Sequence, residues 1–291
     1  MKINNKRISN NCNPYIIAEF SGNHDGNINN FIKLINVAKK AGANAIKLQT
    51  FKPDKITLDS KKKHFLVRHK FKKWNNKTLF DLYNEAYTPW KWHLPILKMA
   101  KQKGLDFIST PFHMSAVDFL DEIGVACFKI ASFEFNDHDL IKYTSKKNKP
   151  LILSTGMASK KEININYNIL NRFSKNNFAF LKCSSSYPAN VEDLNLNTID
   201  FLKKKYKCPI GFSDHSKNDF AAISAIAKGA CIIEKHICLN KNKGIDSDFA
   251  QTPKEFINFV SNCRSAWKSL GETIFGPTKS ERESFKIRRS L

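Results

Sequence analysis

Short apolar runs alternate along this chain with longer stretches in which apolar residues recur at helical spacing. The runs of strand length are Tyr15–Phe20, Ala45–Thr50, Asp106–Pro111, Cys127–Ser132, Pro150–Gly156, Phe178–Pro188, Pro209–Ser216 and Cys231–Cys238. Helical stretches such as 31–43 and 220–230 separate them, and a last one covers 253–271. Eight strand candidates alternating with eight helix candidates predict a single-domain α/β protein with a (β/α)8 TIM barrel fold. An open doubly wound sheet is the alternative.

One connection departs from this regular alternation. The segment from Phe51 to about Tyr87 follows the second strand candidate and is far longer than an ordinary connection between a strand and a helix. A connection of this length is either disordered or a functional lid over the site.

In a barrel of this type, the functional residues lie at the carboxyl ends of the strands and in the loops that follow. The polar residues at these ends are Glu19, Lys47, Gln49, Thr110, Lys129, Ser132, Glu134, Ser154, Thr155, Lys182, Ser185, Ser213, His215, Glu234 and His236. A single serine or threonine there needs no functional explanation, because every strand must emerge into water.

Three lysines inside apolar runs do need an explanation. Lys47, Lys129 and Lys182 each lie within a segment of strand length. A lysine that points into a barrel requires a carboxylate partner or a bound anion, because burying an unpaired ammonium group costs several kcal/mol. Glu19 and Glu234 are possible internal partners, and a phosphorylated, carboxylated small molecule is the functional alternative.

Two histidines end the last two strand candidates. His215 and His236 are separated by one helical stretch, so their strands are expected to be parallel neighbours with both rings at the same edge. Two neutral imidazoles placed in this way would hold one divalent cation with positions left open for a substrate. Two unrelated histidines, one buried and one solvated, are the alternative.

Composition narrows the class of protein. The chain has 291 residues, 42% of them hydrophobic, and neither a signal peptide pattern nor an apolar run of 18 residues, so we expect a cytoplasmic protein without a membrane partner. Its seven cysteines form no CxxC pair and fit reduced thiols. The net charge of +22 is dispersed over the chain without a nucleic-acid-binding motif, which favours anionic substrates over nucleic acid.

A series of motifs resembles, in order and spacing, those of the sialic acid (nonulosonate) synthase family. They are IIAEFSGNHDG, AGANAIKLQTFKPD, FISTPF, FKIASFE, LSTGMAS, LKCSSSYP, GFSDHS and IEKHICL, and the resemblance extends from about Tyr15 to Leu291. The segments KLQTFKPDKITLDS, WNNKTLFDLYNEAYTPWKWH and KCSSSYP resemble the pseudaminic acid branch most. At Ser185 the N-acetylneuraminate branch typically has Asn.

The resemblance implies an enzyme that condenses phosphoenolpyruvate with the open-chain aldehyde of an N-acetylated hexose and releases phosphate. By this resemblance, Lys47, Thr110, Lys129, Ser132, Ser154, Ser185 and Ser213 match the phosphoenolpyruvate site. His215 and His236 match ligands of a divalent metal, Mn²⁺ or Mg²⁺. Positions near the sugar and the reacting centre are matched by Glu134, Gln49, Tyr187, Asp248 and Glu19, with Glu134, Glu19 and Lys129 expected to be catalytic.

Relatives in this family usually continue into a small antifreeze-protein-like domain that reaches the partner's site in a domain-swapped homodimer. This sequence ends in RRSL, where the connection to that domain would begin, so we expect a barrel without it and a weakened homodimer. The sugar acceptor is expected to be of the 2,4-diacetamido-2,4,6-trideoxy-hexose type. The alternatives are a legionaminate or N-acetylneuraminate synthase, another phosphoenolpyruvate or sugar-phosphate aldol-type barrel, and a truncated barrel that binds a ligand or partner without turnover.

Overall fold

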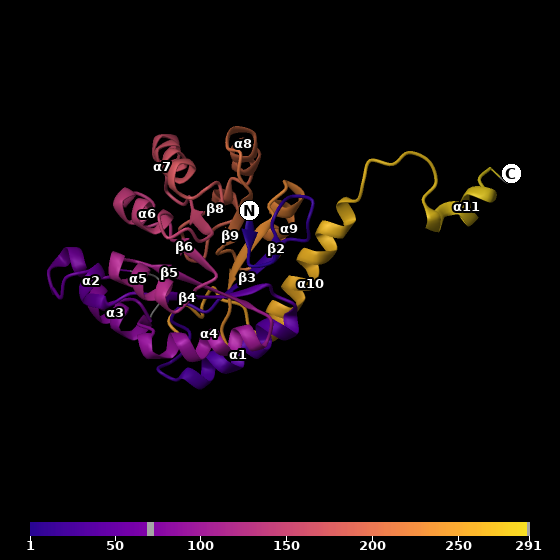
Figure 1. Ribbon diagram of the computed structural model, residues 1–291. Coiled ribbons are helices and arrows are strands. Elements are labelled where there is room, and N and C mark those ends of the chain that lie inside the picture. The colour runs from indigo at the N-terminus through magenta and orange to yellow at the C-terminus, as the bar shows by residue number, and fades with distance from the viewer. Residues whose placement is uncertain (69–72, 290–291) are drawn as a thin grey trace.

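The computed structural model describes residues 1–68 and 73–289, and its centre is a closed barrel of parallel strands (Figure 1). The barrel strands are β3 (Tyr15–Glu19), β4 (Ala45–Thr50), β5 (Asp106–Pro111), β6 (Cys127–Ile130), β7 (Leu151–Ser154), β8 (Phe178–Cys183), β9 (Ile210–Asp214) and β10 (Ile232–His236). They pair in chain order, and β10 closes the ring against β3. The predicted TIM barrel is therefore confirmed over the open sheet.

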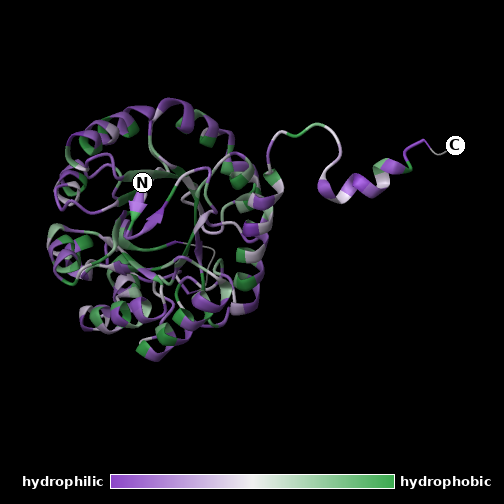
Figure 2. Ribbon diagram, turned by 45° about the vertical axis from the view of Figure 1, so that its right-hand side comes forward, coloured by the Kyte–Doolittle hydropathy of each residue, from purple (hydrophilic) through white to green (hydrophobic). Residues whose placement is uncertain are grey.

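Helices surround the barrel with their apolar faces toward the strands (Figure 2). They are α1 (Ile28–Ala41), α4 (His93–Gln102), α5 (Met114–Glu122), α6 (His138–Ser145), α7 (Lys160–Phe173), α8 (Asn197–Lys205), α9 (Phe220–Ala227) and α10 (Pro253–Leu270). Local sequence sets several of their ends. Ser159 and Glu162 form a capping box at the start of α7, and Gly42, with φ 80°, ends α1 in the left-handed conformation that glycine adopts without strain.

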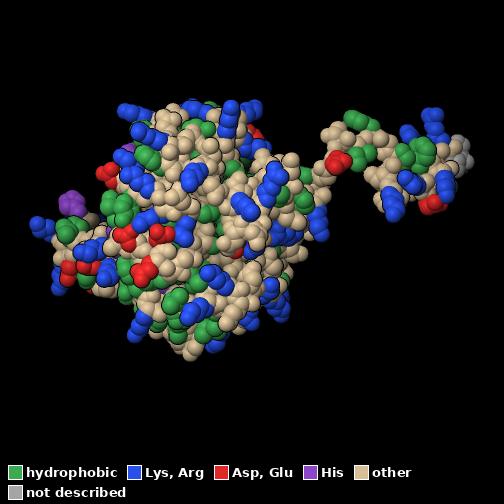
Figure 3. Space-filling model, in the orientation of Figure 1, with side chains coloured by type: hydrophobic (Ala, Val, Ile, Leu, Met, Phe, Trp, Pro, Cys, Tyr) green, Lys and Arg blue, Asp and Glu red, His purple; other side chains and the backbone are tan. Residues whose placement is uncertain are grey.

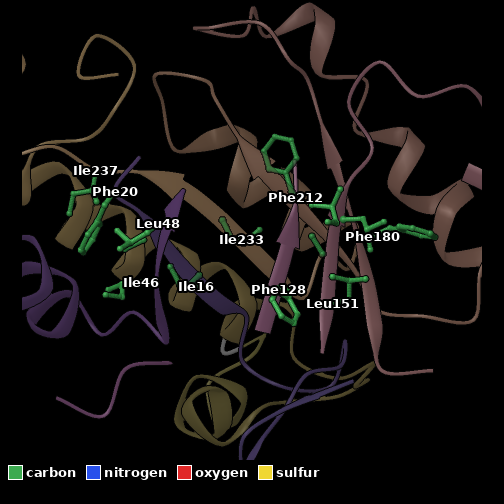
Figure 4. Packing of buried hydrophobic residues seen from close by; sticks show 14 of the residues in the cluster. Ile16, Phe20, Ile46, Leu48, Phe128, Leu151, Phe180, Phe212, Ile233 and Ile237 are labelled. Atoms are coloured by element: carbon green, nitrogen blue, oxygen red, sulfur yellow. The ribbon is translucent and has the colours of Figure 1, made fainter. Parts of the chain in front are cut away.

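The main hydrophobic core lies between the barrel wall and the helices (Figure 4). Side chains alternate between the two faces of each strand, so Phe178 and Phe180 of β8 pack outward while Ala179 and Leu181 point into the barrel. Lys182 shares the outward face of Phe178 and Phe180, and its ammonium group donates to the Cys183 carbonyl oxygen at 2.9 Å. The expectation that Lys182 points into the barrel with Lys47 and Lys129 is wrong, because a short apolar run does not reveal which face a residue occupies.

The long connection after β4 contains short helices in its described parts: α2 (Pro53–Ile56), η1 (Lys63–Phe65), α3 (Leu79–Ala86) and η2 (Trp90–Trp92). Lys73 and Trp74 tie it to the loop after β10. The Lys73 ammonium donates to the carbonyls of Lys241 and Gly244, and the Trp74 indole donates to the Ile245 carbonyl at 2.7 Å. This segment therefore rests on the carboxyl side of the barrel, as expected of a lid, and residues 69–72 lie outside the described part.

A small antiparallel hairpin of β1 (Lys2–Ile3) and β2 (Lys6–Arg7) lies at the amino-terminal end of the chain. It is tied to the start of β5 through Asp106, whose carboxylate accepts from Asn4 at 2.7 Å, Lys6 at 2.9 Å and the Tyr15 hydroxyl at 2.6 Å. Burial and the neighbouring Asp106 raise the pKa of Tyr15 well above its ordinary value. The hairpin was not apparent in the polar residues that open the sequence.

Basic side chains are spread over the visible face rather than gathered in one area (Figure 3). After α10, the exposed segment 271–289 with η4 (Lys279–Glu281) and α11 (Arg282–Lys286) extends away from the barrel (Figure 1). Within residues 1–68 and 73–289, no helix combines the length and apolar character needed to cross a bilayer.

We expect Asp106→Asn to lower the free energy of unfolding by about 1.5–3 kcal/mol, the range for hydrogen bonds to a charged group. The reason is that Asp106 is buried and its charge serves three donors at once. Urea denaturation followed by circular dichroism measures the change. The control is Asp118→Asn, since Asp118 binds Lys147 and Tyr143 at the surface and should contribute less than about 1 kcal/mol. Equal losses in the two variants would contradict the role assigned to Asp106.

Candidate active site

The interior of the barrel changes character toward the carboxyl ends of the strands. Its lower part is apolar, with Ile17, Ile108, Ile152 and Leu181. Two residues further along each strand, the same face carries polar and charged groups: Glu19, Thr110, Ser154, Cys183, and on the other strands Lys47, Lys129, Ser213 and Glu234. Strand register makes Glu19 the direct neighbour of both Lys47 and His236, and pairs Ser213 with Glu234. The predicted residues of these strand ends are thus brought together.

Lys47 is held between two buried carboxylates. Its ammonium group lies 2.5 Å from Glu19 Oε2 and 3.5 Å from Glu234 Oε1, and it donates to Thr110 Oγ1 at 3.3 Å. Burial raises the pKa of Glu19 to about 7 even though Lys47 opposes the shift. Lys129 and Lys47 together hold the pKa of Glu234 below its ordinary value against the effect of burial. The internal ion pairs considered from the sequence are therefore present for Lys47.

The charge of Lys129 is neutralised much less completely than that of Lys47. It donates to Ser154 Oγ at 2.6 Å and to the Ile130 carbonyl at 3.0 Å, whereas Glu234 Oε2 lies 4.0 Å away. The side chain is buried, and burial lowers the pKa of Lys129. An ammonium group in a dry site with one distant carboxylate attracts an anion strongly.

Hydroxyl groups surround Gly156, which lies two residues beyond Ser154, the serine that Lys129 binds. The Gly156 backbone N–H donates to Ser132 Oγ at 3.1 Å. A Cβ atom at Gly156 would lie 2.2 Å from Ser185 Oγ and 2.6 Å from Ser132 Oγ, so the three groups approach each other only because residue 156 has no side chain. Ser185 Oγ is buried and has no hydrogen-bond partner among the described residues. Together with Ser154 and Lys129, these groups form a set of donors suited to a phosphate or carboxylate.

Glu134 follows β6 at the rim of the barrel. Burial raises the pKa of its carboxyl group to about 7, and Lys129 and Lys47 only partly oppose the shift. Its Oε2 atom is buried and accepts no hydrogen bond from the described residues. A carboxyl group with a pKa near neutrality can gain or lose a proton at the pH of the cell, which is the property a general acid or base requires.

His215 and His236 lie side by side, with ring centroids 5.4 Å apart. The Nδ1–H group of His215 donates to the Ser184 carbonyl at 2.9 Å, so Nε2 is the nitrogen that a ligand can reach. Against the effect of burial, the neighbouring Cys183 raises the pKa of His215, so a cation bound at Nε2 would have to displace a proton from it. Burial and the neighbouring His215 lower the pKa of His236 well below its ordinary value, so this ring is neutral. His236 Nδ1 is buried without a partner among the described residues.

These features fit a divalent cation with few protein ligands. A neutral imidazole, a second ring with a fixed tautomer and an orphaned buried nitrogen are properties of metal-binding histidines. Among residues 1–68 and 73–289, no group of three or more His, Cys, Asp or Glu side chains is arranged to hold a metal. A cation bound by the two histidines would therefore take its other ligands from water or substrate.

An aromatic wall made of Trp74, Tyr187 and Phe249 stands beside the histidines. The centroid of Tyr187 lies 4.5 Å from that of His215, and Phe249 lies 4.9 Å from His236. Trp74 packs against both Tyr187 and Phe249, with centroids 6.1 and 6.2 Å away. Three segments that are distant in sequence thus converge here, and only Tyr187 was predicted as a site residue.

The remaining predicted positions differ in their surroundings. Gln49 donates to Ser21 Oγ at 3.0 Å, and Ser21 in turn donates to Asp246. Asp248, by contrast, has a side chain that is 32% exposed and lies 3.8 Å from Lys73. Asp246 was not among the site residues predicted from the sequence, but it is the loop carboxylate connected to Gln49 through Ser21. Asp248 instead contacts Lys73 in the long connection after β4.

Comparison with known proteins identifies the family. The sequence profile described as the NeuB family matches residues 34–275. The chain belongs to the NeuB family. It is 40% identical to pseudaminic acid synthase of Campylobacter jejuni over 259 residues, which are 89% of this chain and 75% of that protein. It is 35% identical to N,N'-diacetyllegionaminic acid synthase of the same organism over 281 residues, 95% of this chain and 83% of that protein.

A solved structure of a NeuB relative supports the fold assignment. The N-acetylneuraminic acid synthetase of Leptospira borgpetersenii, crystallised with citrate, superposes with a TM-score of 0.86 at 34% identity. The alignment covers all of this chain and 96% of that one. The predicted family is therefore confirmed, and with it the conclusion that this chain is an enzyme.

The raised pKa of Glu134 predicts a pH-dependent effect on stability. In the unfolded chain this carboxyl ionises near its ordinary value of 4.5, but in the folded protein only near pH 7. The protonated carboxyl therefore contributes stability that is fully present below about pH 4.5. This contribution is lost as the pH rises through about 7, because the buried group then ionises. Glu134→Gln should raise the midpoint of urea unfolding over wild type at about pH 8 and change it little at about pH 5. Exposed Glu122 provides the control, Glu122→Gln, and an equal effect of Glu134→Gln at both pH values would argue against a buried, protonated Glu134.

Proposed function

We propose that this NeuB enzyme condenses phosphoenolpyruvate with an open-chain 2,4-diacetamido-2,4,6-trideoxy-hexose to form pseudaminic acid and free phosphate. The observation that carries the proposal is the 40% identity to pseudaminic acid synthase of Campylobacter jejuni over 89% of this chain. The site agrees with it chemically, since the incompletely paired Lys129 lies among serine hydroxyls at the carboxyl end of the barrel.

The anionic substrate is assigned to the lysine and hydroxyl groups. In this proposal the phosphate and carboxylate of phosphoenolpyruvate are bound by Lys129, Ser154, Ser132 and Ser185. Beside them, Lys47 adds a second positive charge, and Thr110 and Ser213 add hydroxyl groups. Holding both anionic ends fixes the enol carbon for attack on the aldehyde, which lowers the entropic cost of bringing two substrates together.

The sugar is assigned to the opposite side, beside Tyr187, Gln49 and the loop that carries Asp246. His215 and His236 would hold a divalent cation, Mn²⁺ or Mg²⁺, and such a cation when bound polarises an oxygen ligand as a Lewis acid. When the methylene carbon of phosphoenolpyruvate attacks the aldehyde, positive charge develops on the carbon that bears the phosphate oxygen. Glu134, as a carboxylate, would stabilise that charge and take a proton from the water that adds to this carbon, after which phosphate leaves by cleavage of the C–O bond. Glu19 is the second carboxyl of the site with a pKa of about 7.

A second acceptor is supported by a specific comparison. The 35% identity to N,N'-diacetyllegionaminic acid synthase extends over 95% of this chain, so the legionaminic acid precursor is the alternative substrate. We also propose that the reaction takes place in the cytoplasm, since all seven cysteines are free thiols.

Phosphate release from phosphoenolpyruvate tests the function. We expect release only in the presence of a sugar, fastest with the pseudaminic acid precursor among the N-acetylated hexoses of the pseudaminic, legionaminic and N-acetylneuraminic series. Addition of a chelator should abolish release, and added Mn²⁺ or Mg²⁺ should restore it. If the sugar of the legionaminic series gave the fastest release, the proposed acceptor would be wrong, whereas the proposed condensation reaction would stand. Absence of phosphate release with every sugar would refute the proposed reaction.

Replacing Glu134 by Gln should lower kcat by roughly two or more orders of magnitude, the usual loss for a general acid–base group. The amide preserves the size of the side chain but removes the charge that faces the developing cation. The dissociation constant of phosphoenolpyruvate, measured by calorimetry, should stay within about threefold because the anion site does not include Glu134. Glu122→Gln again serves as the control, and a Glu134→Gln variant with near-normal kcat would mean that Glu19 is the better candidate.

A further inference from the structure

A buried ion pair lies on the outer face of the two strands that carry the histidines. Because side chains alternate along a strand, Asp214 and Lys235 point outward where Ser213, Glu234 and His236 point into the barrel. Strand register places Asp214 and Lys235 directly opposite each other. Each immediately precedes one of the histidines in the sequence.

The contacts of this pair connect both strand ends. Lys235 Nζ lies 2.8 Å from Asp214 Oδ2 and donates to the Ser216 carbonyl at 2.5 Å. Asp214 Oδ1 accepts from the Ser216 backbone N–H at 2.9 Å. His215 lies between Asp214 and Ser216, so the two residues that flank it are both bound to the end of β10.

The surroundings of the pair are dry and apolar. Both side chains are 0% exposed, and the Lys235 ammonium lies 5.4 Å from the centroid of the Phe259 ring on α10. Desolvating two charges costs so much that a buried ion pair is often no more stabilising than apolar side chains of the same volume. Stability alone therefore does not explain why two charged residues occupy this part of the hydrophobic layer.

We propose that the Asp214–Lys235 pair is a positioning device that fixes the separation and orientation of His215 and His236 for a divalent cation. The inference rests on the metal site assigned under the proposed function. Neither residue faces the barrel interior, so both act through the histidines and not on the substrate. Residues that orient metal ligands in this way typically change metal affinity about 10–100-fold when they are altered.

The test is the double variant Asp214→Asn with Lys235→Met, which removes both charges together and keeps the side-chain volumes. The single change Lys235→Met is unsuitable, because it would leave an unpaired carboxylate buried. We expect the double variant to fold, with its Mn²⁺ dissociation constant, measured by electron paramagnetic resonance of free Mn²⁺, raised at least about tenfold. Binding of phosphoenolpyruvate without metal should change less than about twofold, and saturating Mn²⁺ should restore most of kcat.

Lys228→Met is the matched control, since Lys228 lies just after α9 and pairs at 2.9 Å with Asp200, also a carboxylate, but both side chains are partly exposed. Its Mn²⁺ affinity should equal that of wild type. A double variant that binds Mn²⁺ as tightly as wild type contradicts the proposal. A double variant that fails to fold also contradicts it, because that result assigns the pair to stability.

The same measurements separate this inference from the proposed reaction. If wild type binds no Mn²⁺, the metal site itself is wrong and the inference fails with it, whatever the phosphate-release assay shows. If wild type binds Mn²⁺ tightly and the double variant weakly, the inference stands even where no sugar supports phosphate release. In that case only the proposed reaction would be lost.

Discussion

The constraint on which this structure depends is the burial of charge at one end of a closed barrel. Lys47, Lys129, Glu19 and Glu234 are all removed from water, and none would be tolerated there alone. The barrel permits their burial because adjacent strands present them to one another in register, so each ammonium lies within 4.0 Å of a carboxylate. The apolar layer beneath them, which includes Ile17, Ile108 and Ile152, then supplies the packing that keeps this geometry fixed.

The carboxylates neutralise the two buried lysines of this network to different degrees, and this difference points to the ligand. Lys47 has two close carboxylates, whereas Lys129 has one at 4.0 Å and relies on Ser154 and a carbonyl. On the same side of the barrel, Ser185 Oγ and Glu134 Oε2 are buried without partners among the described residues. A purely structural network would satisfy such groups internally, because an unmet buried polar atom costs about 1–3 kcal/mol. The unsatisfied Ser185 hydroxyl, on the side of the incompletely paired Lys129, therefore indicates where an anionic ligand completes the structure, whereas Glu134 Oε2, an acceptor when ionised, is left for a donor such as water.

The fold and most of the site could be predicted because strand ends in a barrel follow directly from the apolar pattern. To locate the eight strands and the polar residues at their ends, it was enough to know the two-residue period of a strand and the order of the elements along the chain. The position of Lys182 could not be predicted, because alternation determines a face only once the register of β8 is known. Asp246 was missed for a different reason: it lies in an irregular loop, where no periodicity relates sequence position to direction. The hairpin of β1 and β2 is too short to leave any pattern.

If the outward pair of Asp214 and Lys235 positions the histidines, as we propose, the site extends beyond the residues that face the ligand. A parallel strand places every second side chain in the hydrophobic layer, so a polar residue next to a functional one is forced to face the helices. In β9 and β10 both of these positions are charged, and they neutralise each other across the strand pair at 2.8 Å. The contacts of this pair include the Asp214 side chain on one side of His215 and the Ser216 backbone on the other, and Lys235 precedes His236 in β10. In the proposed metal site, the apolar layer would be the rigid support of the two histidines, and the inward and outward faces of these two strands would act together.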